Sequence, residues 1–107
     1  MQKPVADGAA ELSIEEVIGF WAIFSVSGSG DSCHISLNRL PEADGYGVFI
    51  EKCSIAALSR ATEWRPTRDG FDLRDGSHAS VARFRRIGVD RFEATDGAYR
   101  MERASLS

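Results

Sequence analysis

The sequence predicts one all-β domain: an eight-stranded antiparallel up-and-down β-barrel with a short N-terminal helix and an extended N-terminal arm. Short segments alternate apolar and polar side chains with a period of two, as half-buried strands do. Turn signals recur at about ten-residue intervals, which suits a barrel or a sandwich, and several are Asp-Gly pairs that favour hairpins between neighbouring strands. The length of 107 residues fits a single hydrophobic core.

Residues 1–12 are assigned to the N-terminal arm, and residues 13–107 to the barrel domain. The arm contains Pro4 and Gly8 and has little apolar periodicity, so no regular element is predicted in it. An extended terminus on a rigid domain can enter a partner's groove and form backbone hydrogen bonds there. The residues by themselves leave open whether the arm binds a partner or is a tail without a role.

A short helix is predicted directly after the arm. Ser13 and Glu16 have the spacing of a capping box. One apolar helical face follows, formed by Ile14, Val17 and Ile18. Gly19 then ends the helix.

Three strands are predicted in the first half of the chain, over residues 19–27, 33–38 and 46–53. The glycine-rich residues 28–31 separate the first two, and Pro41 with the Asp44-Gly45 pair supplies the next turn. Alternation in the second strand places Cys33 on the inner face.

The second half of the chain is predicted to supply five more strands. Residues 54–62 alternate poorly and are expected to form a loop with one helical turn. The strands are expected over residues 63–66, 71–74, 79–86, 91–94 and 99–103. A barrel of eight strands is narrow enough for its own side chains to fill it, so Trp21 and Trp64 are assigned to the core.

Charge is unevenly distributed along the chain, whose formal net charge is -3. Residues 1–53 carry three basic and eight acidic side chains, whereas residues 54–107 carry ten basic and eight acidic ones. The arginines between Arg83 and Arg91 are interrupted by apolar residues, which is typical of strand faces and not of a phosphate-binding stripe. No nucleic-acid partner is therefore expected.

The residue pattern predicts neither an enzyme nor a metal or cofactor site. Asp75, His78 and Ser80 lie within one turn, where a triad with an oxyanion hole rarely forms. Neither cysteine has a well-placed histidine, and no calcium loop or phosphate-binding glycine loop is present. The remaining interpretation is a monomer that binds another protein and has no small-molecule substrate.

Cys33 and Cys53 are the two cysteines, and they allow two interpretations. A disulfide between them would stabilise the fold by about 3 kcal/mol in the chain-entropy treatment, and would indicate an oxidising compartment such as a bacterial periplasm. Two unpaired core cysteines in a cytosolic protein are the alternative.

Residues 1–12 lack the apolar region of a signal peptide, and no segment has the roughly 20 apolar residues of a membrane span. We expect a mature or trimmed form whose export signal lies upstream and whose Met1 is not native. A cytosolic protein is the alternative.

Several motifs in order resemble one known family. They are Gly19-Phe20-Trp21, Cys33-His34-Ile35-Ser36-Leu37, Cys53, Trp64 through Leu73, Asp75-Gly76-Ser77, Val81-Ala82-Arg83-Phe84 and Asp96-Gly97. From about Glu11 to Arg103 the chain is similar to the bacterial Inh-type inhibitors of secreted serralysin-type zinc metalloproteases. The resemblance implies the barrel, a Cys33–Cys53 disulfide, a short helix and an N-terminal trunk.

The resemblance also implies a mechanism and a location. In that family the trunk enters the protease cleft, its terminal amine reaches the catalytic zinc, and barrel residues pack around the cleft mouth. The corresponding trunk residues here are Val5, Ala6, Asp7, Gly8, Ala9, Ala10, Glu11 and Leu12. The zinc belongs to the partner, so the inhibitor itself needs no cofactor. The implied location is the periplasm, with or without an anchor in the outer membrane.

Residues 1 to about 6 depart from the family pattern, because they extend the short trunk. Processing near Val5 to Gly8 would restore it. Related outer-membrane lipoproteins, regarded as inhibitors of broader range, have a longer N-terminal region and are an alternative. A lipocalin-like carrier, suggested by Gly19-Phe20-Trp21, and a purely structural envelope domain are two further alternatives.

Overall fold

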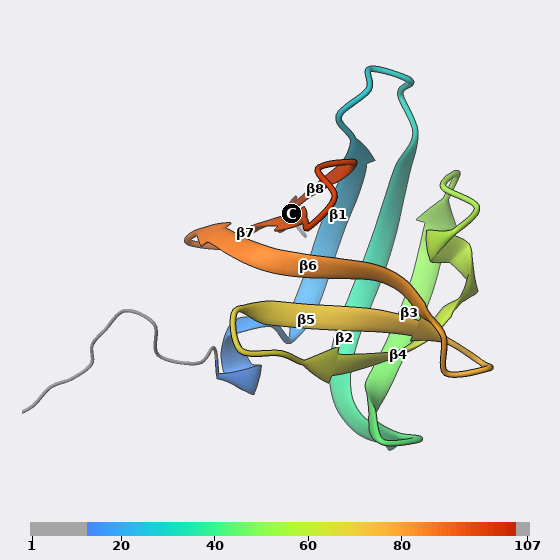
Figure 1. Ribbon diagram of the computed structural model, residues 1–107, viewed down its shortest axis with the longest axis vertical. Coiled ribbons are helices and arrows are strands. Elements are labelled where there is room, and N and C mark those ends of the chain that lie inside the picture. Colours follow the sequence, from blue (N-terminus) through green and yellow to red (C-terminus); the bar gives the residue numbers. More distant parts are fainter. Residues whose placement is uncertain (1–12, 105–107) are drawn as a thin grey trace, which may run out of the picture.

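The computed structural model describes residues 13–104, which form a closed antiparallel barrel in which each strand pairs with its neighbours in sequence (Figure 1). The strands are β1 (Gly19–Ser25), β2 (Ser32–Glu42), β3 (Gly45–Cys53), β4 (Ala61–Pro66), β5 (Gly70–Asp75), β6 (Ser80–Gly88), β7 (Arg91–Ala94) and β8 (Tyr99–Arg103). Two 3-10 turns accompany them, η2 (Ile14–Glu16) and η3 (Leu58–Arg60). The predicted eight-stranded up-and-down barrel is confirmed.

The predicted N-terminal helix is wrong, because residues 14–16 form only the 3-10 turn η2. Glu16 does reach back, and its Oε2 accepts a hydrogen bond of 3.3 Å from the Ser13 backbone N–H. The turn cannot lengthen into an α-helix, because Gly19 already begins β1 with φ at 133° and Trp21 must enter the core. Helix nucleation without room for propagation gives a single turn.

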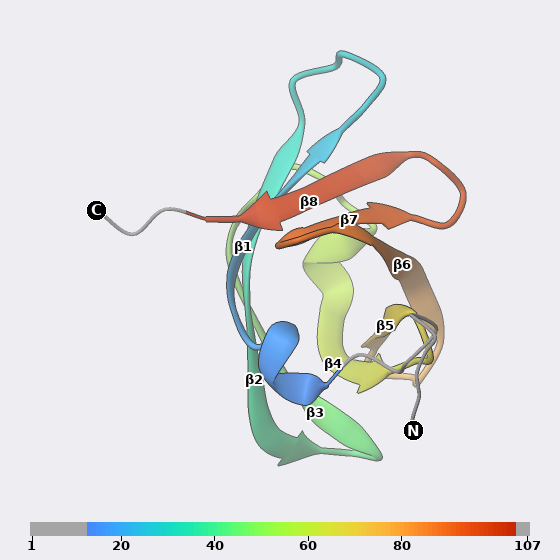
Figure 2. The same cartoon turned by 90° about the vertical axis from the view of Figure 1, so that its left-hand side faces the viewer.

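Different turns and 3-10 segments lie at the two ends of the barrel. At the η2 end lie η2 itself and the turns that join β2 to β3, β4 to β5 and β6 to β7. At the opposite end, which we call the disulfide end, lie the other four connections and η3. Figure 2 looks toward the η2 end and shows η2 lying across the barrel opening.

Aromatic and aliphatic side chains fill the interior. Trp21 and Trp64 are completely buried, as predicted. Phe71 connects the two halves of this core, since its ring lies 6.2 Å from that of Trp64, 5.2 Å from that of Phe84 and 5.3 Å from that of Phe92. Aromatic pairs at such distances add to the stabilisation that burial supplies.

Cys33 and Cys53 form a disulfide and occupy paired positions on β2 and β3. Cys33 lies on the inner face, fully buried, as the alternation predicts. The bond closes a loop over a sequence separation of 20 residues and fixes the end of β3 to the start of β2.

Some element boundaries differ from the predicted ones. β2 continues through Pro41, and the chain reverses at Ala43, which has φ at 53°. β4 begins at Ala61 and not at Glu63, directly after the turn η3 that the predicted loop contains. Among residues 13–104, no helix has the length and apolar character needed to cross a membrane.

Candidate functional site

The segment η2 is held against the barrel by its own apolar residues and by a buried hydrogen bond. Val17 is 1% exposed, and Ile14 and Ile18 pack on the core beside it. The Trp21 indole Nε1 donates to the Val17 backbone oxygen at 2.7 Å. A buried Trp N–H needs such a partner, so this bond fixes where η2 sits on the barrel.

Arg103, at the end of β8, is the main polar anchor of η2. Its Nη1 donates to the Ile18 carbonyl oxygen at 2.7 Å, and its Nη2 donates to the Glu16 carbonyl oxygen at 3.2 Å. The same guanidinium pairs with Asp90 at 3.0 Å and lies 3.9 Å from the centre of the Trp21 ring. One side chain therefore joins η2 to β8 and to the turn between β6 and β7.

Gly19 makes this arrangement possible in two ways. Its φ of 133° is in a region that side chains disfavour. A Cβ atom at this position would also collide with Nη1 of Arg103. The glycine that begins β1 thus leaves the space through which Arg103 reaches Ile18.

Two ion pairs flank the anchor. Nη1 of Arg86 on β6 lies 2.8 Å from Oε1 of Glu16, and Arg39 on β2 pairs with Glu15. These side chains are partly exposed, so each pair alone contributes little stability. Together with Arg103 they connect η2 to three separate strands, which limits its movement relative to the barrel.

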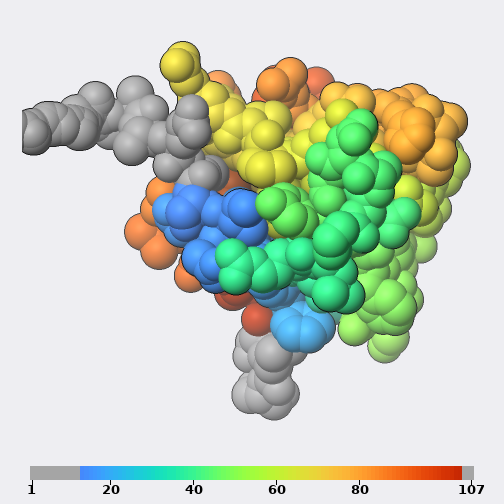
Figure 3. Space-filling view, turned by 90° about the horizontal axis from the view of Figure 1, so that it is seen from below, coloured from blue at the N-terminus to red at the C-terminus, as the bar shows by residue number. Residues whose placement is uncertain are grey.

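Apolar side chains project from the strand ends and the turn around η2. Leu40 is 69% exposed and Val89 is 78% exposed, and Ile87 also faces solvent. A hollow of about 150 Å³ lies beside Val89, lined by Glu16, Arg86, Val89, Asp90 and Phe92. In Figure 3, which views the molecule from below, η2 and the neighbouring turns form one continuous face. We call η2 with Arg39, Leu40, Arg86, Val89, Asp90 and Arg103 the η2 rim.

The predicted trunk, Val5 to Leu12, lies outside the described residues. It directly precedes Ser13, which leads into η2, so the η2 rim is the part of the described molecule next to it in sequence. Cys33, Cys53, Trp21 and Trp64 belong to the barrel, as predicted, and none of them forms part of the rim.

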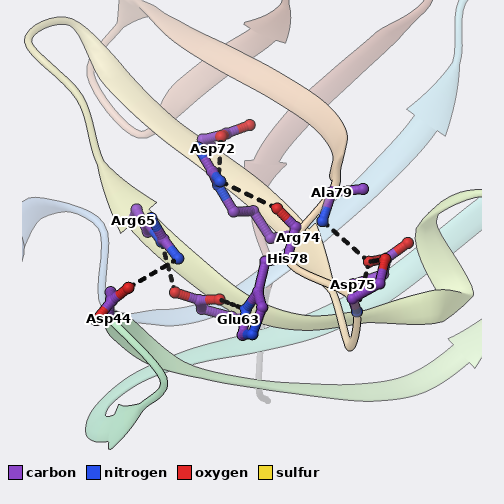
Figure 4. Close-up of polar contacts among 9 residues, drawn as sticks. Asp44, Glu63, Arg65, Asp72, Arg74, Asp75, His78 and Ala79 are labelled. Atoms are coloured by element: carbon purple, nitrogen blue, oxygen red, sulfur yellow. Dashed lines mark hydrogen bonds and ion pairs between the residues drawn. The ribbon is translucent and has the colours of Figure 1, made fainter.

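A second polar cluster lies on the outer wall of β4 and β5 (Figure 4). Glu63 is 1% exposed, and its Oε2 accepts a hydrogen bond of 2.6 Å from Nε of Arg65. Its Oε1 has no hydrogen-bond partner among the described residues, and Nδ1 of His78 lies 3.6 Å away. Desolvation raises the pKa of Glu63, but Arg65, assisted by His78, outweighs it, and the pKa lies below its ordinary value.

This second cluster does not bring together a catalytic triad. Asp75 accepts hydrogen bonds from Ser77 and from the Ala79 backbone N–H, and these lower the pKa of Asp75. His78 faces Glu63, whereas Oγ of Ser80 donates to Oδ1 of Asp72 at 2.5 Å. The three side chains therefore have three different partners, and each contact stabilises either the turn between β5 and β6 or the outer wall of the barrel.

Within residues 13–104, no group of three or more His, Cys, Asp or Glu side chains is placed to hold a metal ion.

Sequence reasoning missed the anchor of η2. Arg103 contacts Glu16 across a sequence separation of 87 residues, and no local pattern links the two. The one available signal is the position of the arginine at the end of the predicted last strand. It can meet the first element only if the barrel closes.

A family model described as "Protease inhibitor Inh" matches residues 11–103. A solved structure, described as the crystal structure of a psychrophilic marine protease MP inhibitor, has the same fold with a TM-score of 0.59 and 21% identity. That alignment covers 87% of this chain and 100% of the other. No curated protein matches the chain.

Proposed function

The chain belongs to the Inh protease inhibitor family, and from that premise we propose that it inhibits a secreted bacterial zinc metalloprotease of the serralysin type. The inhibitor occupies the active-site cleft with its N-terminal trunk, Val5 to Leu12, and is neither a catalyst nor consumed. The single observation that carries the proposal is the arginine-anchored η2 rim, which directly follows this segment in sequence.

A rigid base is what a trunk inhibitor needs. Binding costs free energy for every segment that becomes ordered, so a trunk whose attachment point is already fixed loses less conformational entropy. Arg103, Arg86 and Arg39 fix that attachment point from three strands. Only the trunk itself then has to become ordered when it binds in the partner's cleft.

The trunk amine supplies the chemistry in this proposal. An unprotonated amine has a lone pair that can coordinate the zinc of the partner in place of the catalytic water. The metal belongs to the protease, and the inhibitor contributes no cofactor. A trunk that starts between Val5 and Gly8 suits this role, because the preceding residues extend it.

The exposed apolar side chains of the η2 rim support contact with the mouth of the cleft. Leu40 and Val89 are the most exposed large apolar side chains of the described chain, and both belong to the rim. Burying such side chains against a partner contributes about 25 cal/mol per Å² before the costs of association. We propose that they pack on the protease beside the trunk.

We place the protein in the periplasm, free or anchored at the outer membrane. The Cys33–Cys53 disulfide supports an oxidising compartment. A lipocalin-like carrier is not favoured, because buried tryptophan, phenylalanine and aliphatic side chains occupy the interior where its ligand would lie.

Inhibition of a purified serralysin-type zinc protease tests the proposal. The full chain and versions that start at each position from Lys3 to Gly8 are compared by their inhibition constants. We expect a sharp optimum at one starting residue, lost when the terminal amine is acetylated. If no version inhibits, the metalloprotease assignment fails, and a protease of another class or a structural envelope role becomes the working hypothesis.

Paired substitutions test the rim separately. Val89→Asp is expected to weaken inhibition about tenfold or more, since it places a charge on the contact surface. Val26→Asp is the matched control, because Val26 is 50% exposed at the disulfide end. Equal effects of the two substitutions would remove the η2 rim from the interface while leaving the trunk mechanism standing.

A further inference from the structure

One oxygen of the buried carboxylate on the outer wall is not satisfied by a hydrogen bond. Glu63 is 1% exposed, and Oε2 of its carboxylate accepts from Nε of Arg65 at 2.6 Å. Its Oε1 has no hydrogen-bond partner within residues 13–104. Oε1 faces Nδ1 of His78 at 3.6 Å, which is too long for a hydrogen bond (Figure 4). A buried acceptor in this state indicates that a ligand is missing from its surroundings.

The separation of the two facing atoms matches that of two donors on one metal ion. Zinc lies about 2.0–2.2 Å from imidazole nitrogen and carboxylate oxygen, so two donors at a tetrahedral angle are about 3.4 Å apart. The observed distance between Nδ1 of His78 and Oε1 of Glu63 is 3.6 Å. Imidazole and carboxylate are also the types of donor that Zn²⁺ accepts in proteins.

The turn between β5 and β6 holds His78 in place. His78 has φ at 70°, which is uncommon for a residue with a side chain and is kept by the surrounding hydrogen bonds. Its backbone N–H donates to the Asp75 carbonyl oxygen at 2.9 Å, and its own carbonyl oxygen accepts from Nη1 of Arg74 at 3.0 Å. The turn therefore directs the imidazole toward β4 before a ligand binds.

Glu63 is likewise prepared as a ligand. Burial raises its pKa, but the hydrogen bond and the charge of Arg65 outweigh burial and hold the pKa below its ordinary value. The carboxylate is therefore ionised at neutral pH, as a metal ligand must be. Carboxylates that bind metals are usually hydrogen-bonded at the same time, and Arg65 supplies this second contact through Oε2.

The charges around Glu63 permit a bound cation. Arg65 and Arg74 are each paired with a further carboxylate, Asp44 at 3.6 Å and Asp72 at 2.9 Å. Together with Glu63, the cluster contains three carboxylates and two guanidiniums. The cluster as a whole therefore does not repel a positive ion beside Glu63.

We propose that Glu63 and His78 bind a divalent transition-metal ion, Zn²⁺ by the donor geometry, with water completing its coordination. The side chain of His78 is 60% exposed, so the ion can enter from solvent. Two protein donors make a weak site, in contrast to closed structural sites with four, and larger groups of donors do not occur within residues 13–104. The ion joins the turn between β5 and β6 to β4. The site is separate from the η2 rim and does not depend on protease inhibition.

Zinc titration of the full chain at neutral pH tests the proposal. Isothermal titration calorimetry is expected to show one Zn²⁺ ion bound per chain. Nuclear magnetic resonance of the imidazole groups identifies the ligand, because the chain has two histidines. We expect Zn²⁺ to shift the resonances of His78 before those of His34.

Three substitutions separate this site from an isolated histidine. His78→Gln and Glu63→Gln each remove one donor and are expected to weaken Zn²⁺ binding about tenfold or more. His34→Gln is the matched control, because His34 is an exposed histidine on β2 opposite Lys52. It should leave binding unchanged. His78 is exposed, so His78→Gln reports on the site even if Glu63→Gln fails to fold.

Three results would overturn the proposal. The first is absence of Zn²⁺ binding up to about 1 mM free metal ion. The second is binding that His78→Gln leaves unchanged, which would place the ion elsewhere on the chain. The third is binding that depends on His78 but has the same affinity in folded Glu63→Gln, which would mean that the ion attaches only to an exposed imidazole.

Discussion

Buried carboxylates on the barrel wall are stabilised by arginines that lie two positions further along the same strand. Glu63 pairs with Arg65 on β4, and Asp72 pairs with Arg74 on β5. Residues two apart share a face, so each carboxylate, although buried, meets a guanidinium that is itself partly exposed. A buried carboxylate without such a partner would be strongly destabilising.

Replacing Glu63 with glutamine tests this pair. At pH 7 the Glu63→Gln variant is expected to be less stable by about 1–2 kcal/mol, because a charged hydrogen bond to Arg65 becomes a neutral one. The pKa of Glu63 is lowered by folding, so its contribution is complete above its unfolded value of about 4.3 and is lost as the pH falls through the folded value. Urea unfolding at pH 7 and pH 3 should therefore show the difference between variant and parent shrinking in acid. A difference that is constant with pH would contradict the assignment.

Gly70 is a residue whose lack of a side chain is required by its neighbour. A Cβ atom there would lie 1.9 Å from the Phe84 carbonyl oxygen on β6. Gly70→Ala is expected to destabilise the protein by about 1–3 kcal/mol or more, since the β5 and β6 backbones must separate. Gly76→Ala is the control, because a Cβ atom at Gly76 meets nothing within 4 Å. Thermal unfolding of the two variants tests whether β6 requires a glycine at position 70. Equal melting temperatures of the two variants would contradict this requirement.

At the scale of elements, η2 is a feature that tertiary contacts create. A 3-10 turn of three residues has no stability of its own in water. It persists because Val17 is buried, Trp21 donates to Val17 and Arg103 reaches two carbonyl groups of the segment. An element so dependent on the barrel gives the preceding residues a defined point of departure.

Arg103→Met separates the anchoring of η2 from the integrity of the barrel. The methionine keeps part of the packing on Trp21 but removes the hydrogen bonds to Ile18 and Glu16. We expect the barrel to stay folded and inhibition of the protease to weaken about tenfold or more, because the trunk loses its fixed base. Near-ultraviolet circular dichroism and inhibition constants measure the two effects.

Arg100→Met is the matched control for that substitution. Arg100 is an exposed arginine on the same strand, and it lies opposite Glu93 of β7. It should leave inhibition unchanged. If Arg103→Met also left inhibition unchanged, the anchoring of η2 would have no part in function.

For the whole molecule, closure of the barrel explains how a chain of this size is stable. Closure pairs β1 with β8, the first strand with the last. It also places residues from β2, β6 and β8 around η2. The one weakly closed place is the seam between β3 and β4, and the disulfide lies at the far end of β3 from its two paired residues.

Removing the disulfide is expected to lower the stability of the whole fold. The Cys33→Ala/Cys53→Ala variant should lose about 3 kcal/mol, mostly because its unfolded chain regains the entropy that the bond removes. Urea midpoints of the variant and of the oxidised parent measure the loss. Treating the parent with a reductant should reproduce it, and an unchanged midpoint would show that the bond contributes nothing.

Much of the fold can be read from local patterns. Alternation with a period of two identified the strands and placed Cys33 inside, because the face of a strand residue depends only on its position along the strand. Asp-Gly turns indicated pairing between neighbours in sequence, since a short turn leaves no other partner within reach. The helix before β1 was mispredicted because its local signals, a capping box and three apolar residues, extend over too few residues to outweigh the start of the strand.

The sequence by itself thus determined the strand order and the inward face of Cys33, and its resemblance to a known family implied the Cys33–Cys53 pair. Only the tertiary structure decided that Arg103 anchors η2, that Glu63 is buried on the outer wall and that β3 pairs with β4 through only two residue pairs. The physical reason is distance along the chain. Turns and alternation act over a few residues, whereas these features depend on the direction in which whole strands cross when the barrel closes.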